Sequence, residues 1–153
     1  MNAIARPALT CRPMTGEDLD AVWTIEQRIY AFPWTRGNLA DSLLAGYRCT
    51  VMERDSQMIG YAVLALGAGE AHLLNLSIDA VWQGKGYGTE LLRHQIDLAR
   101  AAGARIMLLE VRPSNEVARK LYRRFGFDQL TVRRGYYPDG KGREDALLLA
   151  LRL

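Results

Sequence analysis

The sequence predicts an α/β protein in which a mixed β-sheet carries helices. Three observations predict it. Short apolar or alternating segments with strand spacing recur along the chain. Segments with helical spacing separate several of them, and glycine, proline or capping residues stand at the boundaries. The length of 153 residues suits one domain spanning 1–153, enough to bury roughly two thirds of the unfolded chain's surface.

The N-terminal part begins with an alternating segment, LTCRPM at 9–14, which predicts a strand. Thr15 then has the side chain of a helix N-cap, and acids in the first turn of 16–32 suit the positive end of a helix dipole. The FPW segment at 32–34 ends this helix because proline cannot continue it. Thr35, directly after this segment, can cap a second helix that ends at Leu44.

The middle of the chain has the pattern of three strands. YRCTVMER at 47–54 and MIGYAVLAL at 58–66, joined by a tight turn, predict an antiparallel hairpin. EAHLLNLSID at 70–79 predicts a third strand, followed by a glycine-rich stretch and a helix to about Ala102.

The last third predicts a strand, a helix and two strands. RIMLLEVR at 105–112 has the composition of a buried strand, and the next helix is expected from Ser114 to Gly126. Strands at 127–137 and 143–153 flank a PDGKG turn.

The stretch WQGKGYG at 82–88 lies between a strand and a helix, where backbone N–H groups and the helix dipole favour an anion. A turn that merely saves space is the alternative. A Walker A loop requires glycine five residues before the Gly–Lys pair, where Asp79 stands. A dinucleotide fingerprint fails at Thr89 in one register and at Leu91 in the other.

The glutamine and glycines at Gln83, Gly86 and Gly88 resemble the pyrophosphate-binding signature of the GNAT superfamily of acetyl-coenzyme A-dependent N-acetyltransferases. Three further segments resemble its RimI-type branch, the ribosomal-protein-alanine N-acetyltransferases: IEQRIYAFPWT, LLEVRPSNEVARKLYRRFGF and RRGYYPDGKGREDALLLAL. The similarity runs from the first helix to the last strand.

This resemblance implies the GNAT fold, a mixed central sheet of about seven strands flanked by about four helices. It implies acetyl-CoA as cosubstrate, and no metal. Glu110 matches the general base and Tyr122 the general acid. The implied cofactor-binding residues are Leu76, Ser77 and Ile78 for the pantetheine arm, Gly84, Lys85, Gly86, Tyr87, Gly88 and Thr89 for the pyrophosphate, and Asn115.

The residues themselves leave structural alternatives open. Glu110 lies in an otherwise apolar strand, where a core-facing carboxylate needs a partner or a function and an outward-facing one needs neither. Tyr122 also has the position of an aromatic on the buried face of its helix. Asn115 can contact a cofactor or simply cap that helix.

The resemblance implies acetyl transfer to the N-terminal α-amino group of a protein, the N-terminal alanine of a small-subunit ribosomal protein. Acyl transfer requires a neutral amine. An α-amino group is roughly one-seventh neutral at pH 7, whereas a lysine is neutral only about 0.04% of the time. One carboxylate base is therefore adequate for an α-amine. We expect direct attack on the thioester, without an acyl-enzyme.

The acceptor site is expected between the FPWT segment and the RRGYYPDGKG loop, with Trp34, Tyr136 and Tyr137 beside the peptide. Each of these aromatics can instead be a packing residue. Glu26 can attract a basic acceptor, but a charge on the helix surface is the favoured interpretation.

Composition restricts the remaining function classes. Cys11 and Cys49 are isolated thiols without the spacing of metal ligands, which fits a cytoplasmic protein. No apolar run approaches the ~20 residues of a membrane span, so we expect no membrane contact. The oligomeric state stays open, and a monomer is compatible with the sequence. Arginine outnumbers lysine seventeen to three, but the basic pairs are too scattered to predict direct nucleic-acid binding. Rival hypotheses are a GNAT enzyme for a lysine, polyamine or antibiotic, a coenzyme A-binding module without chemistry, and an RNA-binding domain.

Overall fold

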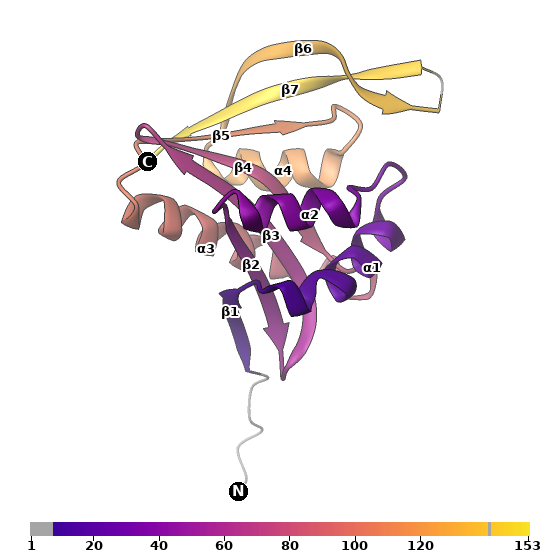
Figure 1. The fold of residues 1–153 in the computed structure, drawn as a ribbon. Helices are drawn as coiled ribbons and strands as arrows, with labels where there is room; N and C mark the ends of the chain where they lie inside the picture. The colour runs from indigo at the N-terminus through magenta and orange to yellow at the C-terminus, as the bar shows by residue number, and fades with distance from the viewer. Residues whose placement is uncertain (1–7, 141) are drawn as a thin grey trace, which may run out of the picture.

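The computed structural model describes residues 8–140 and 142–153, and a seven-stranded sheet runs through them (Figure 1). Along the sheet the strand order is β1-β2-β3-β4-β5-β7-β6. The strands are β1 (Leu9–Pro13), β2 (Arg48–Arg54), β3 (Gln57–Gly67), β4 (Glu70–Ile78), β5 (Ile106–Val111), β6 (Asp128–Asp139) and β7 (Gly142–Arg152).

Helices cover both faces of the sheet (Figure 1). They are the short 3-10 helices η1 (Gly16–Asp18) and η2 (Ala80–Trp82) and the α-helices α1 (Leu19–Ile29), α2 (Arg36–Leu44), α3 (Tyr87–Ala101) and α4 (Glu116–Phe125). Apolar residues of α1 and α2 pack with Val51, Tyr61 and Val63. Those of α3 and α4 form a second cluster with β5 and β7. Each helix therefore buries one apolar stripe against one face of the sheet.

The predicted order of strands and helices is confirmed, and several boundaries differ, two of them for a local physical reason. The first helical residues, Gly16–Asp18, form a 3-10 turn, in which the Asp18 backbone N–H donates to the Thr15 carbonyl oxygen at 3.0 Å and the Asp18 carboxylate accepts from the Thr15 backbone N–H at 2.8 Å. The helix α4 begins at Glu116 rather than Ser114, because the Asn115 side chain caps it by accepting from the Ala118 backbone N–H.

The centre of the sheet opens where β4 and β5 meet. These strands pair in parallel only from Glu70–Leu73 to Ile106–Leu109. Beyond that, the register of β4 against β3 passes from Leu73 to Asn75 and leaves Leu74 as an extra residue. Such a bulge bends its strand. The bulge accounts for the divergence of the C-terminal ends of β4 and β5, which the sequence alone did not predict.

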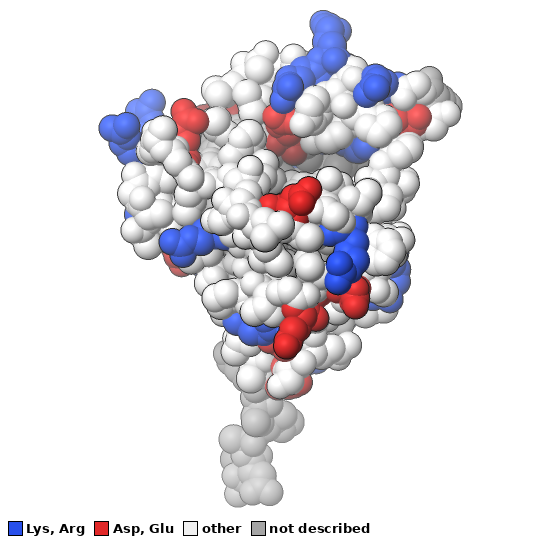
Figure 2. All heavy atoms as spheres, viewed as in Figure 1, with Lys and Arg blue, Asp and Glu red and all other residues white. Residues whose placement is uncertain are grey.

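Charged side chains are spread over the face that carries α1 and α2. On this face, blue and red atoms alternate without forming one continuous basic stripe (Figure 2). No helix in the described part of the chain is both long and apolar enough to cross a membrane.

Candidate active site in the cleft between β4 and β5

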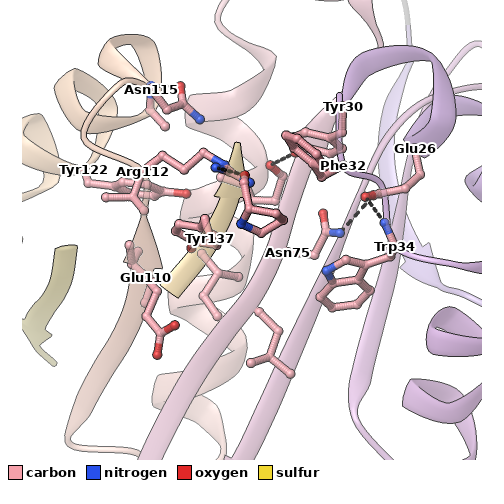
Figure 3. A pocket seen from close by; sticks show the side chains of 17 residues that line it. Glu26, Tyr30, Phe32, Trp34, Asn75, Glu110, Arg112, Asn115, Tyr122 and Tyr137 are labelled. Atoms are coloured by element: carbon pink, nitrogen blue, oxygen red, sulfur yellow. Dashed lines mark hydrogen bonds between the residues drawn. The ribbon is translucent and has the colours of Figure 1, made fainter. Parts of the chain in front are cut away.

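A cleft of about 280 Å³ occupies the gap between the diverging strands (Figure 3). Segments from both halves of the chain line it. They are residues 26–34 of α1 and the loop after it, 73–76 of β4, 109–112 of β5 and the turn after it, positions 115–122 of α4, and 137–138 of β6. The two predicted catalytic residues, Glu110 and Tyr122, therefore line one and the same cleft.

Glu110 lies on the α1–α2 side of β5. Its neighbours Leu109 and Val111 point into the opposite core, with 1% and 5% of their surface exposed, so alternation places Glu110 on the other face. Its side chain is only 13% exposed, and its carboxylate accepts a hydrogen bond of 2.8 Å from the Arg133 guanidinium on β6. The carboxylate thus has an ion-pair partner at the edge of the cleft.

Tyr122 reaches the cleft from the opposite face. Its ring packs edge-on against Phe127 with centroids 5.5 Å apart, so the expectation of a buried aromatic is also confirmed. Burial raises the pKa of the phenol above its ordinary value, and the nearby Tyr30 and Tyr137 raise it further. Tyr122 is therefore a protonated hydroxyl at neutral pH, able to donate a hydrogen bond.

The C-terminal end of β4 has one unpaired side. Leu76, Ser77 and Ile78 pair with β3, whereas β5 has already diverged from them. Of the three residues, Leu76 lines the cleft. At Gly60 on β3, an added Cβ would lie 2.7 Å from the Ser77 carbonyl oxygen, so glycine is what allows β3 to approach this segment closely.

The glycine turn is attached directly to this strand. The Gln83 side chain donates a hydrogen bond of 2.8 Å to the Ile78 carbonyl oxygen. Gly84 and Gly86 both adopt positive φ, 75° and 87°, and Gly86 is the N-cap of α3. A Cβ at either glycine would meet nothing within 4 Å. The space-saving explanation of this turn is therefore wrong, and backbone conformation is what requires glycine there.

The six residues predicted for the pyrophosphate surround the N-terminus of α3. Lys85 is exposed, while Tyr87, Gly88 and Thr89 are half-buried in the first turn of a 15-residue helix. The unpaired N–H groups of a helix N-terminus suit an anion. Asn115, predicted as a cofactor contact or a cap, is the N-cap of α4 and also lines the cleft.

The predicted acceptor aromatics divide into two groups. Trp34 and Tyr137 line the cleft. Tyr136 is outside this lining and 42% exposed, with its ring edge-on to Tyr137 at 4.9 Å and under the Arg133 guanidinium at 4.3 Å. Burial and a hydrogen bond to Glu110 raise the pKa of Tyr136. Tyr136 therefore does not line the cleft but contacts Tyr137, which does, and the Glu110–Arg133 pair.

Arg112 was not singled out from the sequence, yet it bridges the two sides of the cleft mouth. Its guanidinium carbon lies 5.5 Å from the ring centroid of Phe32 and 4.3 Å from that of Tyr137. It also donates to the Pro138 carbonyl oxygen at 2.8 Å and contacts Glu144 at 3.4 Å. The available signal was its position two residues after Glu110, at the end of a buried strand.

Glu144, in the GREDA segment, attaches the β6–β7 hairpin to the start of α4. Its carboxylate accepts hydrogen bonds of 2.9 Å from both the backbone N–H and the hydroxyl of Ser114. These bonds, and then the Arg112 contact, lower the pKa of the Glu144 carboxyl. The segment therefore shapes the cleft without lining it.

Glu26 corrects an expectation. The sequence favoured a surface charge, but the residue is 1% exposed. It accepts hydrogen bonds from the Trp34 backbone N–H at 2.9 Å and the Asn75 amide at 3.0 Å (Figure 3). The Tyr61 hydroxyl donates a third hydrogen bond, at 2.8 Å. Its position four residues after Val22 was the signal, because that spacing puts both on the buried stripe of α1.

Comparison with known proteins finds similarity over most of the chain. The model of the acetyltransferase (GNAT) family matches residues 19–127. The chain is 40% identical over 138 residues to the [ribosomal protein bS18]-alanine N-acetyltransferase of Salmonella typhimurium, covering 90% of this chain and 93% of that protein. The Escherichia coli K12 enzyme of that name is 40% identical over 142 residues, or 93% of this chain and 96% of that protein.

Solved structures agree with this similarity. The crystal structure of the ribosomal-protein-S18-alanine N-acetyltransferase from Escherichia coli matches with a TM-score of 0.89 and 37% identity, covering 95% of this chain and 94% of that one. Arabidopsis thaliana Naa50, in complex with a bisubstrate analogue, matches with a TM-score of 0.82, 21% identity and coverage of 95% and 99%. The latter likeness is one of fold.

Proposed function

This chain belongs to the acetyltransferase (GNAT) family, and from that premise we propose that it acetylates the N-terminal alanine of a small-subunit ribosomal protein. Acetyl-CoA is its acetyl donor. The observation that carries the choice of acceptor is the 40% identity, over 90% of this chain, to an enzyme named for alanine acetylation of ribosomal protein bS18.

Two adjoining parts of the structure support a donor site for acetyl-CoA. The side of β4 that β5 leaves unpaired, at Leu76, Ser77 and Ile78, offers backbone groups to the amides of a pantetheine arm. The turn Gly84–Thr89 offers backbone N–H groups and the positive end of α3 to a pyrophosphate. The Gln83 side chain bonds to the Ile78 carbonyl oxygen and so ties the turn to the end of β4.

Two side chains then perform the acid–base chemistry. The acceptor α-amine, once neutral, attacks the thioester carbonyl carbon and forms the new C–N bond. Glu110 takes up the proton that the amine nitrogen releases, directly or through a water molecule. As the C–S bond breaks, Tyr122 donates its phenolic hydrogen to the sulfur of coenzyme A, which leaves as a thiol.

Direct transfer is favoured over an acyl-enzyme because neither cysteine has the setting of a nucleophile. Cys11 and Cys49 do not line the cleft. Burial raises the pKa of both thiols, that of Cys49 to about 11, which leaves little reactive thiolate at neutral pH.

The proposal is tested by incubating the purified protein with acetyl-CoA and a peptide carrying the Ala-initiated N-terminus of the ribosomal protein. Fragment mass spectrometry should place one acetyl group on the α-nitrogen. The same peptide with its N-terminus already blocked, but with lysines free, is the control and should remain unmodified. Preferential acetylation of lysines or free polyamines would replace the proposed acceptor, and absence of coenzyme A release with any amine would argue for a binding module.

A further inference from the structure

Three charged side chains line the cleft: Glu26, Glu110 and Arg112. Two of them have partners of opposite charge, because Glu110 pairs with Arg133 and Arg112 with Glu144. Glu26 takes part in none of the ion pairs found among the described residues. Among the described residues, it is therefore the charged group of the cleft without an ion-pair partner.

Neutral donors hold the Glu26 carboxylate in place. A main-chain N–H, a phenol and an amide supply its three hydrogen bonds, from Trp34, Tyr61 and Asn75. A carboxylate has about four lone-pair sites, so these bonds use most of its capacity without cancelling its charge. Its charge also contributes to raising the pKa values of Tyr61 and Tyr30, after the larger effect of burial.

Burying a carboxylate without a cation is unfavourable, and such groups are usually paired. The site itself implies a cation that arrives with the acceptor, because a protein N-terminus is an ammonium group before it loses its proton. Figure 3 places Glu26 on the side of the cleft opposite Glu110, beside Trp34 and Asn75. The two carboxylates therefore stand on either side of the space that an incoming N-terminus would enter.

We propose that Glu26 is a specificity-determining residue whose buried charge selects acceptors that enter the cleft with an α-ammonium group. This inference rests on the proposed function and names the residue that recognises its amine. Since Glu26 is 1% exposed, it acts through its charge across the cleft wall and through Asn75 and Trp34, and it does not take up the reacting proton. Proton removal remains with Glu110.

A structural role and an electrostatic role make different predictions. If Glu26 only fixed the loop at Trp34, its loss would weaken all acceptor peptides alike. If its charge recognises the ammonium, its loss would weaken only peptides that carry one. The comparison therefore requires two peptides that differ in a single group: an Ala-initiated peptide and the same peptide with that alanine replaced by a propionyl group.

Binding of both peptides is measured by calorimetry in the presence of coenzyme A, at a pH below the α-amine pKa of about 7.8 so that the amine is charged. Wild-type protein should bind the ammonium peptide about ten-fold more tightly, as expected for unit charges near one another at a partly buried site. Glu26→Gln should bring this ratio close to one. Tyr61→Phe, which removes one donor and retains the charge, should preserve the ratio.

Equal binding of the two peptides by the wild-type protein would overturn the inference, and this result needs no variant to fold. Full preservation of the ratio in a folded Glu26→Gln protein would also overturn it. Thermal unfolding of each variant verifies the fold. Failure of the proposed function is a separate result, because wild-type protein would then bind neither peptide or would acetylate other amines.

Discussion

The Arg133 guanidinium donates a hydrogen bond of 2.8 Å to Oε1 of Glu110, joining β6 to the proposed base on β5. The sequence around Glu110 does not reveal this partner, since the two positions are 23 residues apart. The pair fixes the carboxylate at the cleft edge while leaving Oε2 without that bond. Several consequences for catalysis and stability can be measured.

Replacing Glu110 by glutamine removes the proton acceptor and keeps the size of the side chain. We expect kcat for the Ala-initiated peptide to fall about 10²–10⁴-fold, the usual contribution of a general base. The dissociation constant of acetyl-CoA should stay nearly unchanged, since the donor site is built from β4 and α3. Thiol release measures kcat, and calorimetry measures the dissociation constant.

Arg133→Gln, which keeps the Glu110 carboxylate, is the matched control and should lower kcat less. A normal kcat in Glu110→Gln would remove Glu110 from the mechanism.

Replacing Tyr122 by phenylalanine removes one hydroxyl and keeps the ring that packs on Phe127. The loss of the hydrogen-bond donor to the leaving sulfur should lower kcat by about 10²-fold. Thermal unfolding should change little, which separates chemistry from stability. Accumulation of covalently acetylated protein in either the wild type or this variant would contradict direct transfer.

Replacing Gly86 by alanine tests the glycine turn. Its φ of 87° is left-handed, and a side chain there costs about 1–2 kcal/mol although the space is open. If the turn relaxes to avoid this strain, its N–H groups no longer converge, and KM for acetyl-CoA should rise with little change in KM for the peptide. Gly67→Ala is the control, because that glycine also has open space but no positive φ. Equal effects of the two substitutions would show that the turn does not hold the donor.

The stability of the protein should fall steeply with pH in the alkaline range. Burial raises the pKa values of Tyr61 and Tyr122 above their ordinary value of about 10. Above about pH 10 the unfolded chain releases protons that the folded chain keeps, so the free energy of unfolding decreases as pH rises, by up to ~1.4 kcal/mol per pH unit for each tyrosine. Below about pH 10 both states are protonated and these tyrosines contribute no slope.

Urea unfolding on both sides of about pH 10 measures this slope. Tyr122→Phe should reduce it by the share of one tyrosine. A slope that is identical in the wild type and in this variant would mean that the Tyr122 phenol ionises in the folded protein as it does in the unfolded chain.

Local chemistry determined much of what the sequence predicted. Thr35 caps α2 by accepting a hydrogen bond from the Asn38 backbone N–H at 3.0 Å. A threonine hydroxyl at the start of a helix satisfies a backbone N–H that has no partner within the helix. The glycines of the turn were identified by spacing, and their positive φ is a property of the backbone within a few residues. Period-two and helical patterns likewise act over one element at a time.

The tertiary structure decided what depends on distant contacts. The bulge at Leu74 and the divergence of β4 from β5 create the cleft, and strand pairing across the sheet sets both. The spacing of Glu26 from Val22 could have shown that it is buried, but its donors Tyr61 and Asn75, 35 and 49 residues away, could not be read from the sequence. The sequence by itself thus determined the elements and the family resemblance, through short-range preferences. Only the folded chain decided which charged groups are paired and which have no ion-pair partner among the described residues, because that depends on neighbours that sequence spacing does not record.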